Sequence, residues 1–145
     1  MTEKDSIAGF LAQRTLALLG ASRDARSYSS AVRRELEGRG YRVLPVNPAG
    51  GPGFFPGMAA LPEKVETALI MVPKGAAEAA VLEALAAGVS RVWLNQGSVS
   101  EAAARAAAEA PSGHVVGRCI LMFLEPVRSI HRFHRTLAGL FGRLP

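Results

Sequence analysis

Small, amide-bearing and cationic residues follow each strand-like stretch of this chain, and their types limit the chemistry open to it. The residues in these positions are Gly20-Ala21-Ser22, Asn47-Pro48, Pro73-Lys74, Asn95-Gln96-Gly97 and Arg118-Cys119. They offer backbone N–H donors, amides and cations, which bind anions and hydrogen-bond a nucleotide base. No carboxylate pair, metal-spaced His/Cys cluster or Ser–His–Asp arrangement is evident from the spacing. The pattern predicts anion binding without catalytic residues and without a metal.

An alternation of strand-like and helix-like segments must position these groups. We expect strands near residues 15–20, 41–48, 66–72, 90–95 and 113–118, and helices near 5–13, 29–38, 75–87 and 99–109. The glycine-rich stretch 49–57 predicts a loop, and 58–63 a helical turn. These spacings favour an α/β fold, a Rossmann-like doubly wound parallel five-stranded sheet with flanking helices. Ligands bind beyond the carboxyl ends of the strands in such sheets.

The first strand–helix unit is the strongest candidate for a phosphate site. A strand that ends in Gly20-Ala21-Ser22, followed by a helix capped by Ser29 or Ser30, presents N–H groups to a phosphate. The same glycine turn is also what any parallel-sheet protein needs after its first strand. In the second strand, Pro45 has no N–H and predicts a nearby strand end or an irregular ladder.

Two absences argue against a nicotinamide cofactor. The Gly-x-Gly-x-x-Gly fingerprint lacks its second and third glycines after Gly20, and Asn47 stands where an acidic residue would hold the ribose hydroxyls. A nucleotide with a 3′-phosphate and no need for that carboxylate fits better. Lys74 and one of Arg23 or Arg26 are the cations expected to meet its phosphates. An NAD(P)-binding oxidoreductase or redox sensor is the alternative.

Four stretches, 19–22, 40–48, 93–97 and 118–119, resemble the small stand-alone CoA-binding proteins. These are Rossmann-like domains similar to the CoA-binding domain of the succinyl-CoA synthetase α subunit. The resemblance spans about residues 7–125, and Gly-Tyr-Arg-Val-x-Pro-Val-Asn-Pro at 40–48 is its most specific motif. It implies a CoA (or acyl-CoA) binding protein. The implied contacts are Gly20, Ala21, Ser22, Arg26, Ser29, Ser30, Asn47, Pro48, Val72, Pro73, Lys74, Gln96 and Gly97.

The chain departs from the family pattern at three places. Arg26-Ser27-Tyr28-Ser29 replaces the usual Arg-Pro-Ser, and Gly117 replaces the Asp that usually precedes Arg-Cys. The third strand ends in Val72-Pro73-Lys74, without the family's usual acidic residues and arginine, and is closer to the synthetase subunit.

Length and composition predict one domain over residues 1–145. The chain has 49% hydrophobic residues, a net charge of +5 and a single cysteine. Its arginines are not interleaved with aromatics, which argues against nucleic acid as a partner. There is no apolar run of about 18 residues and no secretory signal, so we expect no membrane span and a cytoplasmic location.

The tail and the cysteine leave alternatives open. Apolar residues at helical spacing in 126–145 predict a C-terminal helical extension that covers a sheet edge, pairs two copies as a homodimer, or lies on a membrane surface. A protein-interaction module that acts through this helix is a further alternative. Cys119 is either a buried small residue or a thiol that forms a mixed disulfide with CoA, with Arg118 stabilising its thiolate. A CoA adduct in the mass spectrum after mild oxidation would distinguish the two.

Overall fold

The computed structural model describes residues 1–124, and these residues alternate between strands and helices. The strands are β1 (Thr15–Leu19), β2 (Arg42–Val46), β3 (Thr67–Ile70), β4 (Arg91–Leu94) and β5 (Gly113–Val116). The α-helices are α1 (Glu3–Leu11), α2 (Tyr28–Gly38), α3 (Ala77–Ala86) and α4 (Glu101–Ala107). Short 3₁₀ turns occupy Met58–Ala60, Lys74–Ala76, Gln96–Ser98 and Ile120–Phe123. The predicted helix at 126–145 lies outside the described residues.

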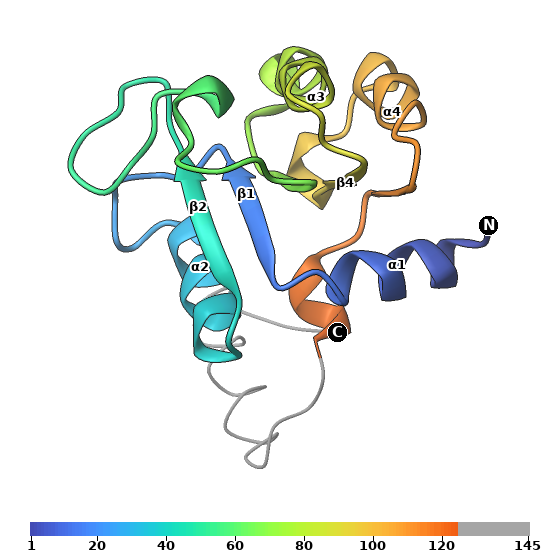
Figure 1. Ribbon diagram of the computed structural model, residues 1–145, viewed down its shortest axis with the longest axis horizontal. Helices are drawn as coiled ribbons and strands as arrows, with labels where there is room; N and C mark the ends of the chain where they lie inside the picture. The colour runs from blue at the N-terminus through green and yellow to red at the C-terminus, as the bar shows by residue number, and fades with distance from the viewer. Residues whose placement is uncertain (125–145) are drawn as a thin grey trace.

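The five strands form one parallel sheet with the order β2-β1-β3-β4-β5, covered by helices on both faces (Figure 1). The apolar residues of β1 alternate between the two faces. Leu16 and Leu18 pack with α1 and α2, whereas Ala17 and Leu19 pack with α3 and α4. Burial on both faces explains why β1 is an unbroken apolar run. The predicted doubly wound, Rossmann-like fold is confirmed.

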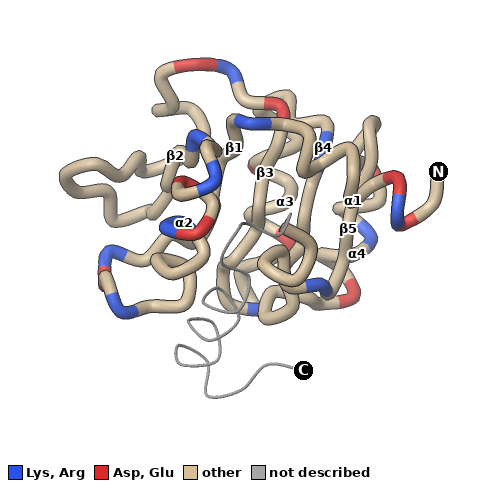
Figure 2. The backbone as a smooth tube through the Cα atoms, turned by 90° about the horizontal axis from the view of Figure 1, so that it is seen from below, with Lys and Arg blue, Asp and Glu red and all other residues tan. Residues whose placement is uncertain are grey.

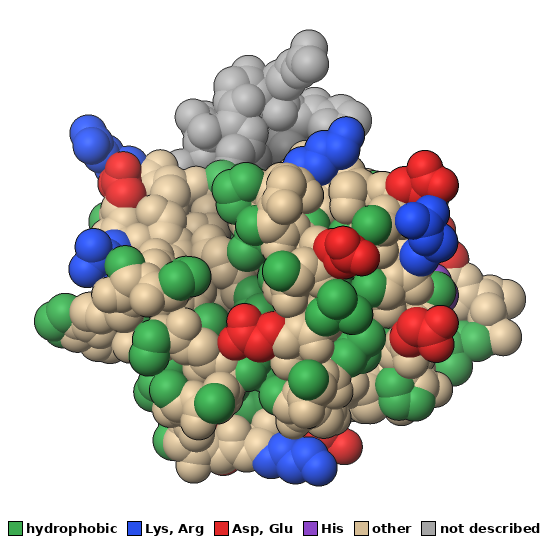
Figure 3. All heavy atoms as spheres, turned by 90° about the horizontal axis from the view of Figure 1, so that it is seen from above, with side chains coloured by type: hydrophobic (Ala, Val, Ile, Leu, Met, Phe, Trp, Pro, Cys, Tyr) green, Lys and Arg blue, Asp and Glu red, His purple; other side chains and the backbone are tan. Residues whose placement is uncertain are grey.

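The outer layer made by α3 and α4 has a mixed surface. Figure 3 shows this side of the molecule, with hydrophobic side chains scattered between separated charged ones. Leu82 of α3 is an exposed hydrophobic residue. Such mixing is ordinary for helices that cover a sheet and face solvent on their other side.

The helix starts predicted at residues 5, 75 and 99 differ by two residues from Glu3, Ala77 and Glu101, and the predicted N-cap of α2 was wrong. A capping box starts α1, in which the Thr2 hydroxyl accepts from the Asp5 N–H and the Asp5 carboxylate accepts from the Thr2 N–H. The N-cap of α2 is Ser27, whose hydroxyl accepts from the Ser30 N–H at 3.1 Å, and not Ser29 or Ser30. Each of these serines suits an N-cap by residue type, so the sequence alone does not select one.

The strand end expected near Pro45 is confirmed, and the ladder around it is regular. Pro45 pairs with Leu18 in an unbroken register, and β2 ends one residue later at Val46. The loop that follows returns to the outer edge of β2, where Phe55 forms a parallel bridge with Val46 and its N–H donates to the Pro45 carbonyl at 2.9 Å. Since β2 is an edge strand, it tolerates a proline without loss to a central ladder.

Candidate functional site

The strand order reverses between β1 and β3, which makes this point of the sheet the expected ligand crevice. Gly20 lies at the end of β1 with φ +95°. A Cβ atom on it would lie 2.6 Å from both the Met71 carbonyl carbon and the Val72 amide nitrogen. The loop after β1 thus packs directly against the end of β3, and only glycine permits that contact.

The N–H groups of Gly20, Ala21 and Ser22 already have acceptors inside the chain. Those of Gly20 and Ala21 both donate to the Val46 carbonyl at 3.1 Å. The Ser22 N–H donates to the Ser29 hydroxyl at 2.9 Å. A phosphate at this turn would therefore have to replace these bonds or bind to side chains beside them.

Serine hydroxyls close the loop between β1 and α2. The Ser27 hydroxyl donates to the Ser30 hydroxyl at 2.9 Å, and the Ser30 hydroxyl donates to the Asp24 carbonyl at 2.7 Å. The Asp24 carboxylate accepts from the Arg26 N–H at 2.9 Å. Ser29 and Ser30, predicted as ligand contacts, therefore hold the loop in its shape, and Ser27 joins them.

Asn47 connects the loops after β1 and β2. Its side-chain Nδ2 donates to the Ala21 carbonyl at 2.9 Å, and its Oδ1 accepts from the Ala49 N–H at 2.8 Å. The first bond fixes the two loops against each other at the crevice, and the second turns the chain just after Pro48. The Asn47 side chain therefore has a structural role at the crevice: it fixes the positions of the loops after β1 and β2.

The ends of β3 and β4 are joined in the same way by Ser98, which sequence reasoning missed. This residue is 1% exposed, and its hydroxyl donates to the Val72 carbonyl at 2.5 Å. The bond holds the Val72-Pro73-Lys74 turn against the turn that contains Gln96 and Gly97. Predicted site residues from all four loops therefore meet at one edge of the sheet.

Comparison with known proteins shows to which family the chain belongs. The family model of the CoA binding domain matches residues 14–125. The chain belongs to this family. A hypothetical protein from Pyrococcus horikoshii OT3 is similar at 26% identity, with 96% of this chain and 94% of that one covered and a TM-score of 0.71. A Thermus thermophilus structure is similar at 29% identity, with 94% and 99% covered and a TM-score of 0.71. A conserved hypothetical protein from Pyrococcus furiosus reaches 30% identity and a TM-score of 0.67, with 77% and 99% covered.

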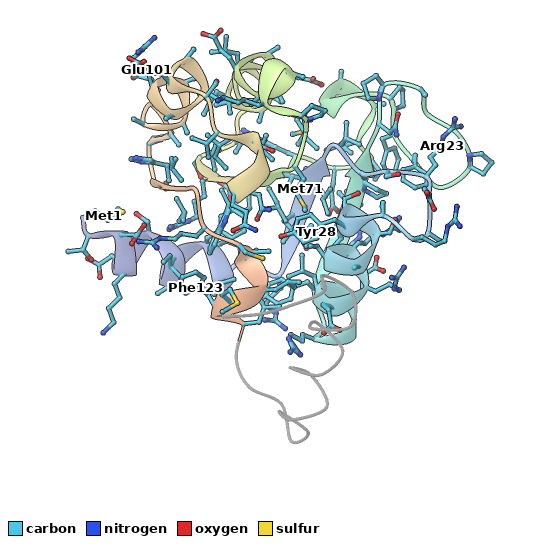
Figure 4. The ribbon with its side chains drawn as sticks, turned by 180° about the vertical axis from the view of Figure 1, so that it is seen from behind. Met1, Arg23, Tyr28, Met71, Glu101 and Phe123 are labelled. Atoms are coloured by element: carbon cyan, nitrogen blue, oxygen red, sulfur yellow. The ribbon has the colours of Figure 1, made fainter. Side chains whose placement is uncertain are left out.

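A hydrogen-bonded group of Tyr28, Asn95 and Cys119 lies beside the crevice of this CoA binding domain. Buried Asn95 donates from Nδ2 to the Tyr28 hydroxyl at 3.2 Å, while its Oδ1 accepts from the Ile120 N–H at 3.4 Å. The Tyr28 hydroxyl lies 2.9 Å from the Cys119 sulfur. Burial, and secondarily the contact with Cys119, raise the pKa of Tyr28 and keep it a neutral phenol. Figure 4 shows Tyr28 near Met71, at the centre of this edge.

Arg118 does not serve the cysteine as expected. Its guanidinium binds both carboxylate oxygens of Glu3 at 3.1 Å, and this contact lowers the pKa of Glu3. The thiol of Cys119 contacts Tyr28 instead. The prediction that Arg118 stabilises a thiolate is therefore not supported, and the disulfide with CoA stays a prediction.

Two hollows lie away from the predicted site. One, of about 400 Å³, is at the amino ends of β1 and β3 and includes Arg14 and Lys64 in its lining. The other, of about 270 Å³, lies between the start of α1 and β5 and includes His114. Among residues 1–124 no group of three His, Cys, Asp or Glu side chains could hold a metal. No helix in that part of the chain has the length and apolarity to cross a membrane.

Proposed function

We propose that the protein binds CoA or acyl-CoA across the carboxyl ends of its strands, and that it does so without catalysis. The observation that carries this proposal is the meeting of four loops at the β1/β3 switch point in a member of the CoA binding domain family. Asn47 occupies the end of β2, where a nicotinamide site would place a carboxylate. The lack of a carboxylate at this position favours CoA over an NAD-linked oxidoreductase.

The cations of the crevice support a polyanionic ligand. Lys74 is exposed at the start of the turn after β3, and it forms no ion pair with any other residue of 1–124. Elsewhere Lys and Arg are interspersed with Asp and Glu along the chain, as Figure 2 shows. A small ligand with several phosphates fits this distribution better than a nucleic acid does. The cytoplasm, where CoA and reduced thiols occur together, is the proposed location.

Calorimetric titration of the nucleotide-free protein tests the proposal. We expect binding of CoA, and no comparable binding of NAD or NADP. Lys74→Ala is expected to weaken CoA binding about fivefold, because one exposed charge contact is worth about 1 kcal/mol.

Lys64→Ala is the matched control, since it removes an exposed lysine from the hollow at the amino ends of the strands. Its affinity for CoA should equal that of the unmodified protein. Preferential binding of NAD or NADP would contradict the proposal and favour the oxidoreductase alternative. The interaction module at 126–145 lies outside the described residues and stays a prediction.

A further inference from the structure

Arg23 is an uncommitted cation that lies across the loop after β2. A Cβ atom added to Gly51 would lie 2.9 Å from its Nη1 and 3.2 Å from its Cδ, so the side chain rests on that glycine. Within residues 1–124 it makes neither a hydrogen bond nor an ion pair. Figure 4 shows Arg23 at the periphery of the molecule, beside this loop. A guanidinium so placed has its donors available to a ligand.

Arg26, the other arginine of the same loop, is placed differently. Its Nε lies 3.5 Å from the Asp24 carboxylate, and its side chain is 92% exposed. The Asp24 carboxylate thus partly balances the charge of Arg26, and the Arg26 side chain extends into solvent. Of the two arginines considered for phosphate binding, Arg23 is the one that faces the loop after β2.

The loop under Arg23 is fixed in position and has no negative charge. Residues 47–57 contain no Asp or Glu. Phe55 holds the loop along β2 through hydrogen bonds with the backbone of Pro45 and Asn47. On the side of α2, the Arg33 guanidinium lies 5.7 Å from the centre of the Phe54 ring. The loop is thus anchored along β2, and it carries no negative charge that would repel a phosphate beside Arg23.

The end of the second strand is where an open α/β sheet holds the adenosine ribose of a bound dinucleotide. A carboxylate there binds free ribose hydroxyls, and an arginine nearby accommodates the ribose 2′-phosphate of NADP instead. The 3′-phosphate of CoA is on the neighbouring carbon of the same ribose, within reach of an arginine at the same place. In this chain the position combines Asn47 with unpaired Arg23. We propose that Arg23 and the loop at Gly51 form the subsite for the ribose 3′-phosphate of CoA. This inference rests on the proposed function and adds to it a preference for CoA over 3′-dephospho-CoA.

Calorimetric titration with CoA and with 3′-dephospho-CoA tests the subsite. The unmodified protein should bind CoA about fivefold more tightly than 3′-dephospho-CoA, the value of one charge contact at an exposed arginine. Arg23→Gln should lose that preference by weakening CoA alone, and Arg23→Lys should retain part of it as a point charge. Arg26→Gln should keep the preference, whatever its overall affinity. Arg105→Gln, on the exposed side of α4, is the charge-matched control.

Several results would overturn the inference, and they differ from a failure of the proposed function. Equal weakening of both ligands by Arg23→Gln would leave CoA binding intact and refute the subsite. Loss of the preference in Arg26→Gln instead would move the subsite to that residue. Binding of neither ligand by the unmodified protein would refute the function and the subsite together. Preferential binding of NADP would do the same, because its 2′-phosphate presents similar chemistry. Melting curves of each variant should match that of the unmodified protein, since Arg23 is exposed.

Discussion

Gly20→Ala should lower the free energy of unfolding by about 3 kcal/mol and the melting temperature by about 10 °C. The new methyl group would meet backbone atoms of Met71 and Val72 at 2.6 Å, and these cannot move aside without disturbing β3. The backbone at Gly20, with φ +95°, also strains any residue that has a Cβ. Thermal and denaturant unfolding, followed by circular dichroism, measure the loss.

Gly38→Ala is the control for this substitution. Gly38 lies in α2, and a Cβ there would have no atom within 4 Å. We expect its free energy of unfolding to stay the same or to rise by up to about 1 kcal/mol, because alanine is the better helix former. If Gly20→Ala were as stable as Gly38→Ala, the close approach of β1 and β3 at the crevice would be wrong.

Trp93→Ala is expected to cost about 3 to 5 kcal/mol of stability. The indole is fully buried in β4, with its centre 5.2 Å from that of the Phe10 ring and 5.8 Å from that of Phe123. Its Nε1 donates to the Arg118 carbonyl at 2.8 Å, which fixes the backbone just before Cys119. Removal of the ring would leave a large cavity and an unpaired carbonyl.

Trp93→Phe separates these two effects. It retains most of the apolar volume and loses the hydrogen bond to the Arg118 carbonyl, so we expect a smaller cost of about 1 to 2 kcal/mol. The chain's single thiol should then react faster with a disulfide reagent, because the backbone before Cys119 is no longer held. Equal destabilisation by both variants, or an unchanged thiol reaction rate, would contradict this role for the indole nitrogen.

Local sequence patterns predicted the fold well. Apolar runs such as residues 15–19 located all five strands, and glycine marked the turn where β1 meets the crevice. Strand positions and tight turns depend on residues that are close in the chain, so they can be predicted from a single sequence. Helix starts were less accurate, because Ser27, Ser29 and Ser30 have equal claim to an N-cap until the backbone is known.

Contacts between distant residues could not be predicted. The order β2-β1-β3-β4-β5 decides which strand ends are neighbours, and nothing in one sequence states it. Tyr28 and Cys119 are 91 residues apart, and the contact of their side chains depends on that order. The same is true of the Ser98 bond to Val72 and of the Arg118 pairing with Glu3, which replaced the expected role of Arg118.

Mapping of backbone amide NMR shifts during titration with CoA tests the central claim most directly. Binding at the carboxyl edge predicts shifts for Ser22, Gly51, Lys74 and Gly97, with Lys64 at the opposite edge unchanged. A ligand that shifts the amide of Lys64 and its neighbours instead, or that shifts none, would contradict CoA binding at the β1/β3 switch point.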